Sequence, residues 1–167
     1  FTFILGLVWT GYLFGYILGP DPASNGIFGD TQACATSGCH VGNPLNAAGG
    51  SLTLTGLPTA WVPGQAYPLT VQVQKTNAIL YGFQLSAVAD ATNQQAGTLT
   101  AGSARVKVIT SVGIQYAEHS NAQVSNPTGT FLVTWTAPSS ASAGKVRFNL
   151  AGNAANALGG VVFIGHH

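Results

Sequence analysis

The sequence predicts an all-β fold, an immunoglobulin-like antiparallel sandwich preceded by one N-terminal transmembrane helix and an irregular loop. Three observations lead to this fold class. Residues 1–19 carry no charge, residues 20–48 are irregular and rich in Gly, Pro, Asn and Ala, and residues 49–167 contain short segments that alternate apolar with polar side chains. The chain therefore divides into a predicted anchor, a connecting loop and one β domain of ordinary size.

The predicted anchor is the stretch FTFILGLVWTGYLFGYILG. As a helix it would extend roughly 28 Å, close to the thickness of the hydrocarbon core of a bilayer. A secretory signal has a shorter apolar region of about 7–15 residues and a small-residue cleavage site, and this stretch has neither feature. A pilin stem can also begin with Phe, but its usual fifth-position glutamate is replaced by Leu5. We therefore predict a retained transmembrane helix over residues 1–19.

Three glycines of this stretch, Gly11, Gly15 and Gly19, are spaced by four residues and share one face of the predicted helix. Small residues at this spacing let a second helix approach closely in lipid. Glycine is also simply common in membrane helices. The spacing favours association of this face with an integral membrane protein complex.

The β domain is predicted from period-two alternation separated by Gly, Pro, Asn and Ser. Val, Thr, Phe, Leu and Tyr dominate the alternating segments, and no amphipathic helical pattern competes with them. Seven strands are expected, at 51–57, 67–74, 81–90, 104–111, 129–138, 144–152 and 160–165. The segment 152–160 is interpreted as a Gly/Asn turn. The aromatic residues expected to form the core are Trp61, Phe83, Phe131, Trp135 and Phe148.

Composition limits the class of partner. Charged residues make up 5% of the chain, against roughly 25% in typical soluble domains, and the net charge is +1. With no basic run or basic patch interleaved with aromatics, there is no reason to expect nucleic-acid binding. A polar, nearly uncharged surface suits an extracytoplasmic protein or a subunit covered by partners.

The only two cysteines of the chain lie in CATSGCH, residues 34–40. In c-type haem attachment, C-x-x-C-H, two thiols bind the haem covalently and the adjacent histidine ligates the iron. Here Cys34 and Cys39 are separated by four residues instead of two, but His40 still follows the second cysteine directly. A Cys34–Cys39 disulfide would suit an exported domain but would leave His40 unexplained, and a zinc site would need further ligands. The motif favours covalently attached haem over these alternatives.

A bound haem would leave the sixth iron ligand to be identified. These 167 residues contain no methionine, so the His–Met pairing is excluded within them. The remaining histidines are His119, His166 and His167. His119 lies in QYAEHSNAQ, expected to be a loop between strands that could present an axial ligand. The neighbouring Glu118 is interpreted as an exposed charge.

Several short motifs together resemble the choice-of-anchor V domain, a family of exported bacterial β-sandwiches distantly similar to Reeler domains. The resemblance spans about residues 28–160 and rests on WVPGQAYPLTVQV, GFQLSAV, AEHS, FLVTWTAP and VRFNLAGNAAN. It implies a haem c motif just before the first strand, where Cys34, Cys39 and His40 lie. It also implies His119 as the distal ligand. The x4 cysteine spacing and the N-terminal anchor depart from the pattern of the family.

An anchored monohaem cytochrome of this kind also resembles the small cytochrome subunits of homodimeric type-I photosynthetic reaction centres. That resemblance implies electron transfer on the periplasmic side of the cytoplasmic membrane, from a soluble electron donor to a membrane complex. The expected cofactor is one haem c, held by Cys34, Cys39, His40 and His119, with His40 and His119 on the iron. We therefore expect an electron-transfer protein and not an enzyme. The alternative is a haem-free structural or adhesive sandwich with a Cys34–Cys39 disulfide.

Overall fold

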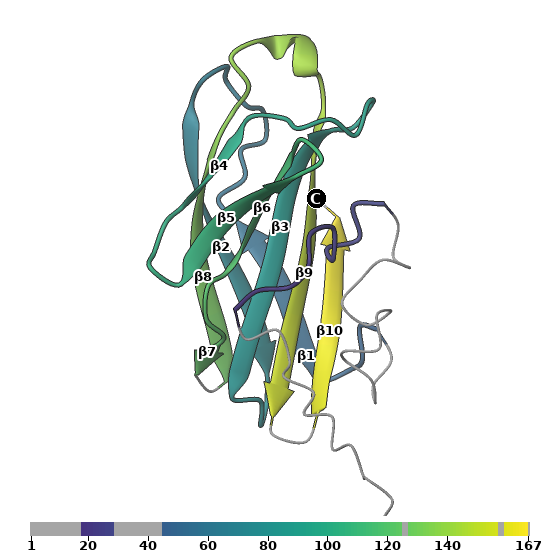
Figure 1. Cartoon of the computed structure of the whole chain (residues 1–167), viewed down its shortest axis with the longest axis vertical. Helices are drawn as coiled ribbons and strands as arrows, with labels where there is room; N and C mark the ends of the chain where they lie inside the picture. Colours follow the sequence, from purple (N-terminus) through teal and green to yellow (C-terminus); the bar gives the residue numbers. More distant parts are fainter. Residues whose placement is uncertain (1–17, 29–44, 125–126, 157–158, 167) are drawn as a thin grey trace, which may run out of the picture.

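The computed structural model describes residues 18–28, 45–124, 127–156 and 159–166. They form two antiparallel sheets, as predicted (Figure 1). The first has four strands in the order β1, β2, β8 and β4, which are Gly50–Thr55, Ala66–Lys75, Thr128–Thr136 and Thr98–Ala101. The second has the order β10, β9, β3, β6 and β5, which are Gly159–His166, Val146–Asn156, Leu80–Ala89, Ile114–His119 and Val106–Ser111. The two-residue strand β7, Gln123–Val124, also pairs with β3, and a short 3-10 helix, η2, spans Ala141–Ala143.

The alternation in the sequence predicts most of these strands. Each of the seven expected segments overlaps a strand of the structure. Three strands, β4, β6 and β7, were not expected, so the assignment of the segment around His119 to a loop was wrong. The expected turn at 152–160 was also placed too early, because β9 continues to Asn156 and pairs with β10.

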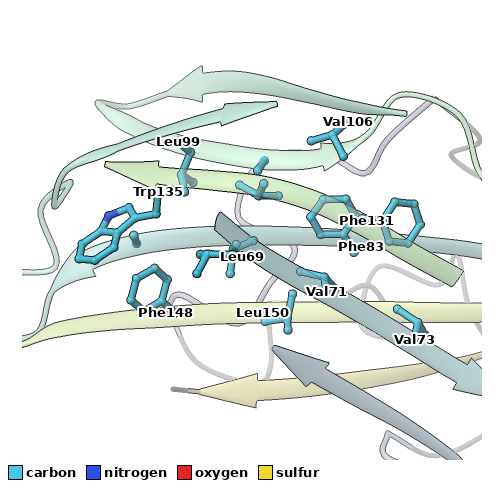
Figure 2. Packing of buried hydrophobic residues seen from close by; sticks show 14 of the residues in the cluster. Leu69, Val71, Val73, Phe83, Leu99, Val106, Phe131, Trp135, Phe148 and Leu150 are labelled. Carbon is cyan, nitrogen blue, oxygen red and sulfur yellow. The ribbon is translucent and has the colours of Figure 1, made fainter. Parts of the chain in front are cut away.

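The hydrophobic core lies between the two sheets. The alternate residues Leu69, Val71 and Val73 of β2 are almost completely buried there. Aromatic pairs join the sheets: Phe83 stacks on Phe131 at a centroid distance of 4.6 Å, and Trp135 meets Phe148 edge-on at 5.0 Å (Figure 2). The predicted aromatic core is confirmed, with Trp61 packed against its margin.

Residues 18–28, here called the strap, lie along the outer face of the six-stranded sheet. Figure 1 shows the strap in purple, in front of β3 and β9. Its residue Ile27 is buried in a second, smaller cluster with Val88, Ile114 and Tyr116. Both faces of β3 are therefore covered, one by the core and the other by the strap.

The predicted anchor at 1–19 falls almost wholly outside the described residues. Within the part of the chain that the structure describes, no helix is long and apolar enough to cross a membrane.

Candidate functional site

His119, the one predicted iron ligand among the described residues, is the last residue of β6. It pairs with Val106 of β5 on one side. On the other side, β6 pairs with β3 as far as Glu118 opposite Gln84, and β7 resumes the pairing with β3 at Tyr81. The imidazole therefore lies where the backbone pairing along β3 is interrupted.

The imidazole fills this interruption. Its Nδ1 lies 3.1 Å from the Phe83 amide nitrogen and 3.3 Å from the Phe83 carbonyl oxygen. The ring also packs flat on Gly82, where a Cβ atom would lie only 2.6 Å from His119 Cε1. Glycine at position 82 thus provides the space that the ring occupies, and the ring bonds a backbone group of β3 that no strand pairs.

The contact at Nδ1 allows two proton arrangements. With Nδ1 unprotonated it accepts from the Phe83 N–H, and with Nδ1 protonated it donates to the Phe83 carbonyl. In the second arrangement the ring lone pair is on Nε2, and anchoring through Nδ1–H in this way is usual for metal-bound histidines. The chemistry of His119 therefore fits an axial iron ligand. Because His119 is 7% exposed, ligation would also require the residues that cover the ring to move aside.

The other predicted haem-binding residues, Cys34, Cys39 and His40, lie outside the described residues, and the predicted haem site stays a prediction. Among the residues that the structure does describe, no three His, Cys, Asp or Glu side chains are grouped to hold a metal ion. Of the other two histidines, His166 ends β10 opposite Asn149, and His167 is not described.

Glu118 was interpreted as an exposed charge, and this was wrong. It is 1% exposed. Its Oε1 lies 3.2 Å from Lys107 Nζ, and its Oε2 accepts a 2.9 Å hydrogen bond from the side-chain amide of Gln84. We call these three residues the polar clamp. A buried carboxylate needs such partners, because an unpaired charge is costly to remove from water. The segment was expected to be a loop, and its local sequence gave no sign of the strap that buries Glu118.

Of the predicted helix-packing face, Gly11 and Gly15 lie outside the described residues. Gly19 is described, with a φ of +113°, so the chain is not helical at this residue. A Cβ atom on Gly19 would lie 2.5 Å from Glu118 Oε1. The positive φ and the close approach to the polar clamp together account for glycine at this position.

Two buried tyrosines have perturbed acidity. Burial raises the pKa of Tyr81 above its ordinary value, and its hydroxyl donates a hydrogen bond to the Lys75 carbonyl at 3.0 Å. Burial likewise raises the pKa of Tyr116, which lies beneath the strap. Ionising either phenol would place a charge among apolar side chains, so both stay neutral near pH 7.

Comparison with known proteins identifies the fold. No protein-family model matches the sequence, and no curated protein matches it. A solved structure of the Reelin-N domain of F-spondin superposes with a TM-score of 0.52 and 18% identity, covering 74% of this chain and 88% of that one. The sandwich is Reeler-like. A human F-spondin Reeler domain gives a TM-score of 0.48 and 18% identity, over 74% of this chain and 91% of that chain.

Proposed function

We propose that this chain is a membrane-anchored monohaem c-type cytochrome that transfers electrons on the periplasmic side of the cytoplasmic membrane. Cys34 and Cys39 would hold the haem covalently and His40 would ligate its iron, which supplies one-electron redox chemistry when bound. The acceptor would be a membrane complex, with a homodimeric type-I photosynthetic reaction centre as the specific candidate. A soluble donor would deliver the electrons.

The observation that supports this proposal is that the chain packs on the sandwich both before and after residues 29–44, the stretch that contains CATSGCH. On the N-terminal side, Ile27 is 4% exposed in the cluster beneath the strap. On the C-terminal side, Ala47 packs against the main core just before β1. Segments that bind ligands are commonly loops positioned by a rigid scaffold in this way.

His119 is the proposed sixth ligand. Its ring orientation is set by Phe83 and Gly82, and its Nδ1–H would donate to the Phe83 carbonyl while Nε2 faces the iron. The same contacts also give His119 a purely structural task, the completion of the pairing along β3. The test therefore has to separate ligation from folding.

The decisive experiment is expression of the whole chain together with a c-type haem maturation system. We expect a covalent haem adduct by mass spectrometry and a reduced-state α band, both lost in a Cys34→Ser/Cys39→Ser control. Recovery of haem-free protein with a Cys34–Cys39 disulfide would contradict the proposal and support the structural or adhesive alternative.

The role of His119 is then tested with His119→Gln, whose side chain can still bond the Phe83 backbone. We expect the spectrum to change from six-coordinate to five-coordinate while the melting temperature shifts only slightly. An unchanged spectrum in a folded variant would exclude His119 as the distal ligand.

The proposed membrane partner requires its own measurement. Solubilised membranes should yield the chain together with a pigment-bearing complex, and Gly15→Leu should weaken that association by obstructing close helix packing. Association unaffected by Gly15→Leu would contradict packing through the glycine face.

A further inference from the structure

We propose that the strap and the polar clamp form a rigid joint, which fixes the position and direction in which the chain preceding residue 18 enters the sandwich. This inference goes beyond the proposed electron transfer and does not depend on haem. Its consequence for the proposed function is that residue 18 would lie at one fixed point on the sandwich, whatever is bound through the segment before it.

The first attachment point is Gln84 of β3, which is 1% exposed. Its side-chain oxygen accepts a 2.8 Å hydrogen bond from the Ser24 backbone N–H, and its amide nitrogen donates to the Asp21 carbonyl at 3.0 Å. One glutamine thus bonds both a donor and an acceptor of the strap backbone. The same amide nitrogen donates to Glu118, which fixes the orientation of the Gln84 side chain.

Glu118 and Gly19 place the beginning of the strap. Lys107 pairs with the buried Glu118 carboxylate and holds it against the sheet. Gly19 lies so close to this carboxylate that a side chain at position 19 would collide with it. The strap therefore starts directly over the end of β6, where it contacts Glu118, the residue that precedes His119 in the sequence.

The second attachment point lies farther along β3. Asn25 is fully buried, and its side-chain amide donates to Ser86 Oγ at 2.8 Å and to the Asn149 carbonyl at 3.1 Å. Its side-chain oxygen accepts from the Ile27 N–H at 3.3 Å, and the Ile27 side chain is buried against Val88. These contacts combine hydrogen bonds with apolar burial.

The separation of the two attachment points is what makes the joint rigid. Gln84 and Val88 are four residues apart on one strand, which corresponds to about 13 Å. A chain held at a single point can pivot, whereas one held at two points this far apart has a fixed direction. If the strap lifts, the hydrogen bonds that join it to Gln84 and Ser86 of β3 are also lost, so partial detachment is unfavourable.

The test is hydrogen exchange by mass spectrometry on the full chain, with Gln84→Ala and the matched control Gln72→Ala. Gln72 lies on an exposed position of β2, in the other sheet. We expect peptides covering 18–28 to exchange at least tenfold more slowly than unstructured peptide, and Gln84→Ala to remove most of the protection of residues 18–24, which Gln84 holds. Gln72→Ala should leave it unchanged.

Two further variants keep the test decisive if Gln84→Ala does not fold. Gly19→Ala should loosen mainly residues 18–22, and Asn25→Ala mainly residues 25–28, because they affect different attachment points. The proposal of a rigid joint would be contradicted by fast exchange of 18–28 in the unmodified chain. Equal exchange of these residues in Gln84→Ala and Gln72→Ala would also contradict it. Haem attachment is measured separately on the unmodified chain, and slow exchange of 18–28 with or without a covalent haem adduct keeps failure here and failure of the proposed function distinguishable.

Discussion

The two sheets have outer faces of similar sequence character but very different surroundings. The outer face of the four-stranded sheet carries exposed or half-buried residues such as Thr53, Gln72, Thr130 and Thr134. The register places Thr53 beside Gln72 and Gln72 beside Thr130. Lys75 is the only charged residue in these four strands. This face is simply the solvated side of a half-buried sheet.

The outer face of the six-stranded sheet also carries polar residues, but there Gln84, Ser86 and Glu118 are almost completely buried. The strap covers them and supplies backbone and side-chain partners. The comparison shows that alternation in a strand reports which side chains are polar, whereas a distant segment decides whether they meet water. The same substitution should therefore have different consequences on the two faces.

The largest expected difference is between an ion pair with a buried carboxylate, Lys107–Glu118, and an exposed ion pair, Lys145–Asp90. Lys107→Met leaves the buried Glu118 carboxylate without its cation, and we expect a loss of about 3 kcal/mol in the free energy of unfolding, measured with urea. The matched control is Lys145→Met, because Lys145 is 80% exposed and pairs with Asp90 at 3.5 Å. That variant should cost less than about 0.5 kcal/mol. Equal losses would contradict the burial of the Glu118 carboxylate.

The next effect in size concerns the tyrosines beneath the two faces of β3. Tyr81→Phe removes the hydrogen bonds from the hydroxyl to the Lys75 and Ala78 carbonyls and should cost about 1 kcal/mol at pH 7. The urea midpoint of Tyr81→Phe, compared with that of the unmodified chain, tests this value. Tyr116→Phe is measured beside it.

The pH dependence of the same variants has a defined sign. The pKa of each buried phenol is raised above the value of about 10 that it has in the unfolded chain. The unfolded state therefore loses these protons first, so stability is constant below about pH 10 and falls as pH rises through the folded-state pKa. Each Phe variant should lose less stability than the unmodified chain between pH 9 and pH 11. A steeper loss in either variant would contradict the burial of that phenol.

A smaller effect, in the opposite direction, is expected at the tip of the β5–β6 hairpin. Val112 and Gly113 form a two-residue loop in which both φ angles are positive, and Val112 is 98% exposed. A β-branched residue is strained in this conformation, which Asn adopts readily. Val112→Asn should therefore raise the free energy of unfolding by about 0.5–1 kcal/mol, seen as a higher thermal midpoint. A lower midpoint would show that Val112 makes a contact worth more than the strain.

The fold was largely predictable because β strands leave a period-two signature wherever one face is buried. The signal failed where that condition does not hold. β4 is only four residues long, and β6 carries Glu118 and His119 at positions that a solvated loop could equally hold. The burial of these two residues depends on contacts with parts of the chain distant in sequence, which no local pattern records.

The haem site stays a prediction, in which spacing points to Cys34, Cys39 and His40 and resemblance favours His119. The sequence did not indicate that the imidazole completes the pairing of β3 or that Gly82 makes room for it. The polar clamp was missed because Gly19, which covers it, was assigned to the predicted helix, and Ser24 lies in a stretch without periodicity.

The smallest expected effect tests the exposed face itself. Thr134 lies between Pro68 of β2 and Thr100 of β4 on the outer face of the four-stranded sheet. Thr134→Val keeps the β-branched shape and exchanges a solvated hydroxyl for a methyl group, so the free energy of unfolding should change by less than about 0.5 kcal/mol. The measurement is a urea titration beside Ser86→Ala, which on the covered face removes the acceptor of the Asn25 amide. Because a buried donor left without its acceptor costs about 1–3 kcal/mol, Ser86→Ala should be clearly the more damaging of the two. If Thr134→Val were as damaging as Ser86→Ala, the face with Thr134 would also have to be covered in the folded protein, and the contrast between the two sheets would disappear.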